Sequence, residues 1–284
     1  MNDTKSWNDL DALQTPDYTN YNNLLLIDGN NLSYRWLQRP NHNNFSHEFI
    51  RTVSSLAKSY EASRTIVCFD FGKSYYRMDM SEEYKANRKK PKEEAEIQRY
   101  DAFFEVLNNL PDILDEEVLK FRGVEADDIL ANLVMKYEND NSYDHIWVVS
   151  SDRDLHQLIS SKTSIFNIFG RKEVTLESMN EDLELDPSLY LLSRIIEGDK
   201  SDNILGVEGI GPKRAQALAK QYTTLDNLLE ALPIKGRAKY IQNLNASKDL
   251  LIRNEKMINL KGYNEEALDA AKEPEVVRDK LSSM

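Results

Sequence analysis

The chain has 284 residues, 40% of them hydrophobic, and a formal net charge of -12 with a pI near 5.0. The length allows a large core domain with an appended module, and no apolar run approaches the roughly 20 residues of a membrane span, so we expect a cytoplasmic protein. One cysteine cannot form an internal disulfide, and four scattered histidines offer no zinc set. The polar segment 1–23 is interpreted as a flexible N-terminal arm without a secretory signal.

Three short apolar runs, each ending in a carboxylate, predict buried strands. They are Asn23–Asp28, Thr65–Asp70 and Asp144–Asp152. Helical patterns lie between them, at Ser46–Tyr60, Glu93–Leu110 and Glu125–Tyr137. This alternation predicts an α/β fold, with a mainly parallel central sheet flanked by helices. In such sheets ligands gather beyond the carboxyl ends of the strands.

The pattern changes at Asp186-Pro187, beyond which it is helical throughout, including Ser201–Leu205. We therefore expect a metal-binding core over residues 24–185 and a helical region over residues 186–284. The charged segment Arg77–Pro91 joins a strand end to a helix and lacks a wide apolar stripe, so it should be exposed and mobile.

Acidic residues recur at the predicted carboxyl edge of the sheet. The candidates are Asp28, Asp70, Glu125, Asp127, Asp128, Asp152, Asp154, Asp199 and Asp202. Ionised carboxylates that share one pocket repel one another, so they need a counter-charge, which a hard dication supplies. Ligands that are all oxygen favour magnesium or manganese, and a set this large suggests two ions about 4 Å apart, as in phosphoryl transfer. Any single Asp after a strand is more often a helix cap or turn former, and it is the repetition that favours a metal centre.

The overall acidity argues against nucleic-acid binding, but the local charge does not. Residues 73–92 carry seven basic side chains against three acidic ones, and residues 205–240 carry six against three. Two basic patches therefore lie in an acidic chain.

The second patch contains a glycine turn, Gly206–Gly211, followed by Pro212 and a helical pattern. Such a helix start presents free backbone N–H groups to phosphate. A dinucleotide-binding fingerprint is the rival reading, but the glycines stand in the wrong order and the preceding segment is predicted to be helical. A helix-hairpin-helix that grips a DNA backbone is the better account, with contacts from Gly209, Gly211, Lys213, Arg214 and Lys239.

The first patch combines Tyr84 with Lys85 and Arg88, an aromatic beside cations at helical spacing. The tyrosine could stack on an unpaired base while the cations pair with phosphates. A solvated charged face is the alternative. The loop follows the strand that ends at Asp70, so it should stand over the metal pocket, where a cation can stabilise charge on a phosphate.

These motifs resemble the 5′-nucleases, a family that includes flap endonucleases and the N-terminal nuclease domain of bacterial DNA polymerase I. The likeness covers roughly residues 24–260 and is strongest to the free-standing 5′-exonucleases (flap endonucleases) of the T-five group of bacteriophages. It rests on Arg122–Asp128, Gly206–Gly211 and Lys239–Ala246. One departure is Arg194, where a lysine is expected in the phage relatives.

The resemblance implies a PIN-like nuclease core, a helical arch at about residues 77–110 and a C-terminal helix-hairpin-helix. It assigns Asp28, Asp70, Glu125, Asp127 and Asp128 to a first metal ion, and Asp152, Asp154, Asp199 and Asp202 to a second. Both ions would be Mg²⁺, with Mn²⁺ as a substitute. Tyr84, Lys85 and Arg88 match the Tyr-Lys-x-x-Arg pattern of the arch, where Lys85 would contact the scissile phosphate. A potassium ion at the glycine turn would involve Val207 and Ile210.

We therefore expect a structure-specific 5′-nuclease, a hydrolase with flap endonuclease and 5′-to-3′ exonuclease activity in DNA replication or repair. Its substrate would be branched or 5′-ended DNA, cut by two metal ions to leave a 5′-phosphate and a 3′-hydroxyl. We expect a monomer in the cytoplasm, that of a bacterial host if the chain is phage-encoded, and no membrane partner; protein partners are unknown. One rival is a DNA-binding protein without catalysis; another is a small-molecule phosphohydrolase, whose Asp-x-Asp pair is absent at Asp28-Gly-Asn30.

Overall fold

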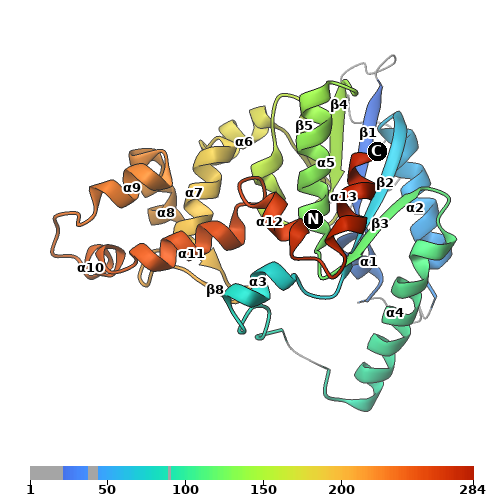
Figure 1. Ribbon diagram of the computed structural model, residues 1–284, viewed down its shortest axis with the longest axis horizontal. Helices are drawn as coiled ribbons and strands as arrows, with labels where there is room; N and C mark the ends of the chain where they lie inside the picture. The colour runs from blue at the N-terminus through green and yellow to red at the C-terminus, as the bar shows by residue number, and fades with distance from the viewer. Residues whose placement is uncertain (1–21, 38–43, 89–90) are drawn as a thin grey trace, which may run out of the picture.

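A computed structural model describes residues 22–37, 44–88 and 91–284 (Figure 1). Its centre is a six-stranded sheet with strand order β3-β2-β1-β4-β5-β6, in which only β6 runs antiparallel to its neighbour. The strands are β1 (Asn23–Asp28), β2 (Ala62–Phe71), β3 (Glu117–Arg122), β4 (His145–Val149), β5 (Thr163–Asn167) and β6 (Lys172–Val174). The predicted α/β class and mainly parallel sheet are confirmed.

Helices cover both faces of the sheet, as the continuous apolar strands require. Successive residues of β1 point to opposite faces: Leu24 and Leu26 join one core cluster, and Leu25 and Ile27 join the other. The first face is covered chiefly by α5 (Ala126–Asp140). The second is covered by α1 (Gly29–Leu37), α2 (Ser46–Ser59) and α4 (Glu94–Ile113). Both faces of β1 are fully buried, which explains its lack of polar alternation.

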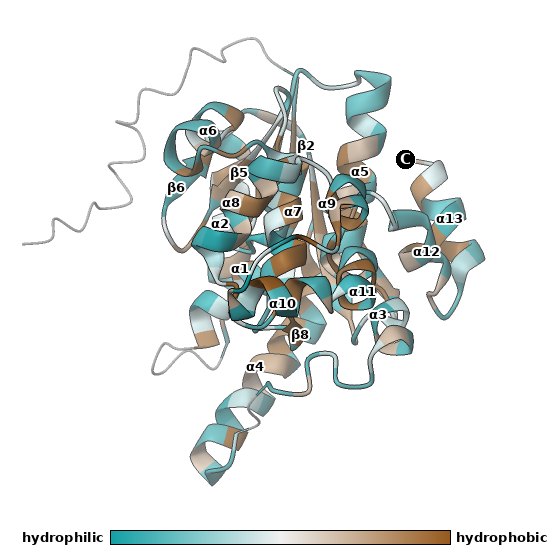
Figure 2. Cartoon of the chain, turned by 90° about the vertical axis from the view of Figure 1, so that its left-hand side faces the viewer, coloured by the Kyte–Doolittle hydropathy of each residue, from teal (hydrophilic) through white to brown (hydrophobic). Residues whose placement is uncertain are grey.

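The segment between β2 and β3, predicted as an arch, is described except for residues 89–90. It contains the short helix α3 (Tyr75–Met80) and the long helix α4, which projects from the body of the molecule (Figure 2). The prediction that residues 77–91 are exposed is wrong for Arg77 and Tyr84, which are only 5% and 1% exposed. Their polar atoms bind core carboxylates, a pairing that the local sequence does not encode.

The C-terminal region continues with a bundle of helices. They are α6 (Leu176–Leu183), α7 (Pro187–Glu197), α8 (Pro212–Tyr222), α9 (Leu225–Ala231), α10 (Lys239–Asn245), α11 (Lys248–Ile258), α12 (Asn264–Asp269) and α13 (Pro274–Ser282). The helical prediction is wrong between α7 and α8, where β7 (Gly198–Asp199) pairs with β8 (Ile204–Leu205). Gly198 has φ +73 and no room for a Cβ against Gly206, so the chain turns into a hairpin there.

The last two helices return to the sheet domain. Leu268, Val277 and Leu281 belong to the same core cluster as α5, and Lys136 of α5 donates to the Leu281 carbonyl. No helix in the described ranges is long and apolar enough to cross a membrane. The predicted arm falls almost entirely outside the described residues, as do Lys89 and Lys90 of the basic patch.

Candidate active site

Four acidic side chains lie near one another at the carboxyl edge of the sheet, as predicted from the ends of the strands and the start of a helix. Asp28 ends β1, Asp70 lies next to the end of β2, Asp152 follows β4, and Asp127 lies in the first turn of α5. Burial, and then the neighbouring Asp70, raise the pKa of Asp28 to about 7. Burial, and then Glu125, raise the pKa of Asp70 to about 6. Asp127 has a raised pKa from burial and from the other three. These carboxylates share negative potential that the protein does not neutralise.

Neutral donors fix the orientation of this group. Asp28 accepts hydrogen bonds from the Asn31 amide and the Ser150 hydroxyl, both at 2.9 Å. Asp70 accepts one from the Ala126 amide at 2.7 Å, at the beginning of α5. The first turn of α1 and the residue that follows β4 therefore hold Asp28 in place, a role that our sequence analysis did not assign to Asn31 or Ser150.

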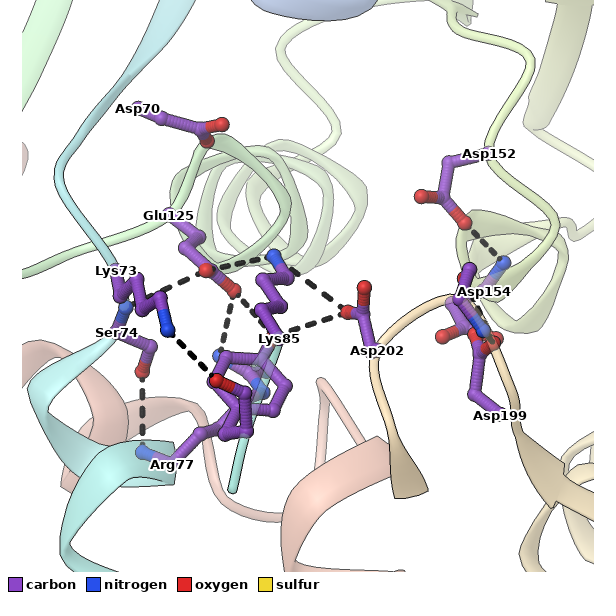
Figure 3. A network of polar contacts seen from close by, with 12 residues as sticks. Asp70, Lys73, Ser74, Arg77, Lys85, Glu125, Asp152, Asp154, Asp199 and Asp202 are labelled. Carbon is purple, nitrogen blue, oxygen red and sulfur yellow. Dashed lines mark hydrogen bonds and ion pairs between the residues drawn. The ribbon is translucent and has the colours of Figure 1, made fainter. Parts of the chain in front are cut away.

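The arch reaches the site through Lys85 (Figure 3). Its ammonium lies 2.7 Å from Glu125 Oε1 and 3.5 Å from Asp202 Oδ2, and its backbone amide donates to the Asp202 carbonyl at 2.9 Å. Lys85 has φ +55, in a region that lysine seldom adopts. Arg88 is half-exposed and donates to Asp202 Oδ1 at 2.9 Å. Both predicted cations therefore stand beside the carboxylates.

Tyr84 does not present its ring for stacking on a base. The side chain is buried, and its hydroxyl oxygen lies 2.7 Å from Glu125 Oε2 and 3.0 Å from Asp202 Oδ2, so the two carboxylates share its single proton. In this structure Tyr84 anchors the arch, because its phenol joins the start of α5 to the β7–β8 turn.

Asp128 points away from the other acids. Arg77 of α3 binds both its oxygens, Nη1 at 2.7 Å and Nη2 at 2.8 Å, and donates through Nε to the Met257 carbonyl. All of these groups are buried. The structure thus uses Asp128 to bind α3 to α5 and α11, and it does not bring Asp128 to the metal cluster.

A second acidic group lies on the other side of the site (Figure 3). Asp154 begins the short 3-10 helix Asp154–Leu158, and Asp199 ends β7. The guanidinium of Arg194 lies between them, 2.9 Å from Asp154 Oδ1 and 2.8 Å from Asp199 Oδ2. Asp199 has a lowered pKa: burial would raise it, but hydrogen bonds from Ser201 and the charge of Arg194 outweigh burial.

Among the described residues, no three acidic, histidine or cysteine side chains already form a closed metal cage. The physical reason is visible in the contacts. Carboxylates without a counter-ion separate, and Lys85 and Arg194 hold Glu125, Asp154 and Asp199. The eight remaining candidates nevertheless lie along one edge as two adjacent groups.

The glycine turn forms the beginning of α8, as predicted. Gly211 caps the helix and Pro212 is its first residue. Asn243 of α10 donates to the Glu208 carbonyl at 2.9 Å, so α10 lies against the turn. Lys213 and Lys239 are exposed there, whereas Arg214 bends back, with its guanidinium 4.6 Å from the Tyr240 ring centroid and 2.7 Å from the Gly209 carbonyl.

Family models account for nearly all of the described chain. Residues 23–184 match the N-terminal resolvase-like domain of the 5′-3′ exonucleases, and residues 185–273 match their C-terminal SAM fold. The chain belongs to the 5′-3′ exonuclease family. As a 5′-nuclease it is an enzyme that hydrolyses phosphodiester bonds, and the predicted family and enzyme class are confirmed.

Individual relatives agree with this assignment. The nuclease is 37% identical to the flap endonuclease of Escherichia phage T5 over 94% of this chain and 93% of the relative. It is 33% identical to a 5′-3′ exonuclease of Bacillus subtilis, covering 78% and 79% of the two chains. A crystal structure of the phage T5 flap endonuclease with DNA and metal ions superposes with TM-score 0.86 at 36% identity, over 92% of this chain and 97% of that one.

Sequence analysis of the 5′-3′ exonuclease named Arg77 and Arg194 but missed their carboxylate partners. Arg77 and Asp128 are 51 positions apart, and Arg194 and Asp154 are 40 apart, so no local spacing links either pair. Both arginines lie beside predicted acidic strand ends or turns, and this was the signal that the sequence offered. Arginines at such places are common on solvated surfaces, so the signal did not single out these pairs.

Proposed function

We propose that this 5′-nuclease cuts branched or 5′-ended DNA near the junction of single strand and duplex, leaving a 5′-phosphate and a 3′-hydroxyl. The observation that carries the proposal is the group of buried acids directly beneath an arch that brings Lys85 and Arg88 to the same place. A DNA-binding protein without catalysis would have no use for carboxylates that repel both one another and the DNA.

The donor set fits divalent metal ions. Burial, and then a neighbouring carboxylate, raise the pKa of Asp28 and of Asp70, and every donor is a carboxylate oxygen, the ligand type preferred by Mg²⁺ and Mn²⁺. Asp28, Asp70, Glu125 and Asp127 would hold one ion, and Asp152, Asp154, Asp199 and Asp202 a second. Bound there, such ions supply a nucleophile at neutral pH and charge stabilisation for the leaving oxygen.

The chain's own cations act on the phosphate. Lys85 lies at the first acidic group, within reach of a phosphate placed between that group and the arch, and its positive charge would stabilise charge that develops during hydrolysis. Arg88 is half-exposed, and can exchange Asp202 for a phosphate oxygen. Tyr84 helps to hold both in position, because its hydroxyl contacts the Glu125 and Asp202 carboxylates that they pair with.

The glycine turn and α10 would grip the duplex away from the cut. Lys213 and Lys239 offer exposed ammonium groups there, and Gly209 and Gly211 keep the backbone accessible. A potassium ion bound by carbonyls of Val207 and Ile210 would complete this contact. Arg214 can also contact the duplex once its guanidinium releases the Gly209 carbonyl.

The same proposal extends to the oligomeric state, the biological process and the division of the chain into regions. We infer a monomer that acts on DNA during replication or repair in the cytoplasm, with residues 24–185 as the nuclease core and residues 186–284 as the DNA-gripping region. The relative that carries most weight is the phage T5 enzyme, which is solved with DNA and metal ions.

Cleavage of an end-labelled 5′-flap duplex tests the proposal. The flap should be cut near its junction in Mg²⁺ and left intact in EDTA, while a small phosphate monoester is not hydrolysed. Tight flap binding without cutting would favour a structure-specific binding protein, and hydrolysis of the monoester alone would favour a phosphohydrolase.

A further inference from the structure

Arg194 occupies the second acidic group in a fixed geometry. Its Nε and Nη2 both approach Asp154 Oδ1, at 3.0 and 2.9 Å, and Nη2 also approaches Asp199 Oδ2 at 2.8 Å. Nη1 donates to the Gly198 carbonyl at 3.3 Å, which ties the guanidinium to the end of its own helix α7. The side chain is therefore held by three acceptors from two segments, the 3-10 helix that begins at Asp154 and β7.

This ion pair is screened from water. The side chains of Arg194, Asp154 and Asp199 are only 15%, 16% and 12% exposed. The other oxygen of Asp199, Oδ1, accepts hydrogen bonds from the amide and hydroxyl of Ser201, both at 2.7 Å. Arginine does not lose its proton near neutral pH. A divalent ion that binds these oxygens must therefore compete with a permanent positive charge.

In the first acidic group, Glu125 is paired with Lys85 of the arch at 2.7 Å, but the other three acids have no such occupant in the described part of the chain. Within the described residues, Asp28, Asp70 and Asp127 form no hydrogen bond or ion pair with a lysine or arginine nitrogen; Asp28 and Asp70 accept only from amides and a hydroxyl. Lys85 thus pairs with one acid of the first group (Figure 3), whereas Arg194 lies between two acids of the second group.

We propose that Arg194 is a resident counter-cation of Asp154 and Asp199 that weakens the second divalent-ion site, so that the DNA-free enzyme loads its two sites unequally. The first ion binds at Asp28, Asp70 and Asp127, and the second binds weakly because Arg194 must first leave. This inference rests on the metal sites of the proposed function. It makes Arg194 a positioning residue that sets ion occupancy.

Titration of the DNA-free protein with MnCl₂, followed by the electron paramagnetic resonance of free Mn²⁺, tests the inference. Wild type should bind one ion tightly and a second weakly. In Arg194→Gln the second ion should bind at least about tenfold more tightly, because a positive charge has left the two carboxylates. Lys200→Gln removes the same charge from an exposed neighbour that makes no described side-chain contact with the acids, so it should leave the second affinity unchanged.

The Mn²⁺ titration distinguishes failure of the Arg194 inference from failure of the proposed metal centre. Two equal ions in wild type with no change in Arg194→Gln, or a weaker second ion in the variant, would overturn the role of Arg194 and leave the metal centre intact. No bound ion in any of the proteins would overturn both.

Thermal unfolding provides a second readout that does not depend on activity. Without its arginine the acidic pair is uncompensated, so Arg194→Gln should melt below wild type in EDTA and gain more from added MnCl₂ than wild type does. An equal gain in both proteins would contradict competition. If Arg194→Gln does not fold, Arg194→Lys serves instead, because one ammonium cannot reproduce the forked contact and should give the same change in smaller degree.

Discussion

The Lys85 ammonium lies 2.7 Å from Glu125 Oε1, so the arch and the first turn of α5 meet at the acidic edge of the sheet. The contact joins a segment of the basic patch to the carboxylate that precedes α5, 40 positions away. It places one positive charge where a phosphate must approach, and the first prediction follows from it.

Lys85→Ala should lower the turnover of flap cleavage by roughly two or more orders of magnitude with a modest loss of DNA affinity, as the removal of a transition-state contact does. Single-turnover rates and flap binding would be measured on the same protein. Lys92→Ala removes an exposed lysine from the same arch and is the matched control. A near-normal rate for Lys85→Ala would remove this residue from the mechanism.

Arg77 and Asp128 should behave as a structural pair. Replacing either partner alone, Arg77→Met or Asp128→Asn, leaves a buried group uncompensated and should lower the free energy of unfolding by about 3–5 kcal/mol. Urea unfolding of both single variants and of Arg77→Met/Asp128→Asn would measure this, and the double variant should lose much less than the sum of the two. Additive losses would mean that the two side chains do not interact.

Asp70 should make the metal-free protein less stable as the pH rises. Its pKa is raised from 3.8 to about 6, first by burial and then by Glu125, so the native protein binds this proton more tightly than the unfolded chain. The resulting stabilisation is present below the unfolded pKa and is lost as the pH rises through the folded pKa.

Asn cannot ionise, so the stability of Asp70→Asn relative to wild type, measured in EDTA, should increase by about 2 kcal/mol between about pH 4 and pH 8. Asp101→Asn, at an exposed position of α4, controls for the loss of a charge elsewhere. A difference between Asp70→Asn and wild type that does not change with pH would contradict the raised pKa.

Lys213 and Lys239 should contribute to DNA affinity and not to the chemical step. Replacing each with Ala should weaken duplex binding and reduce the slope of log affinity against log salt by about one per lysine. The single-turnover rate at saturating enzyme should stay within about threefold of wild type. Lys58→Ala, on the exposed face of α2, is the control; an unchanged salt slope in the Lys213 and Lys239 variants would place the duplex elsewhere.

The sequence predicted those strands and helices whose own residues form a clear local pattern. β1 and the beginning of α5 lie within one residue of the predicted positions, because a fully apolar run and an acidic helix start are local patterns. β3 was missed since it is an edge strand that mixes charged and apolar residues without a clear period, and β7 and β8 were missed because they have two residues each.

The sequence predicted which types of residue gather at one edge of the sheet. It did not predict which of these side chains pair with one another. Asp128 has the same spacing signal as Asp127, and only the packing of α3 against α5 gives it to Arg77. Likewise the pattern around Tyr84 is suited to base stacking, yet tertiary contacts bury its ring and use its hydroxyl. Long-range pairing decides which side chains are available to a ligand.

The most direct test of the central claim is a comparison of flap binding and flap cleavage in wild type and Asp127→Asn. Binding would be measured in EDTA and single-turnover cutting in Mg²⁺, both on one labelled 5′-flap duplex. We predict that wild type cuts near the junction, and that the variant binds the flap within about threefold of wild type but cuts it about a thousandfold more slowly or less. Cutting by Asp127→Asn at the wild-type rate would contradict a reaction that depends on this acidic edge.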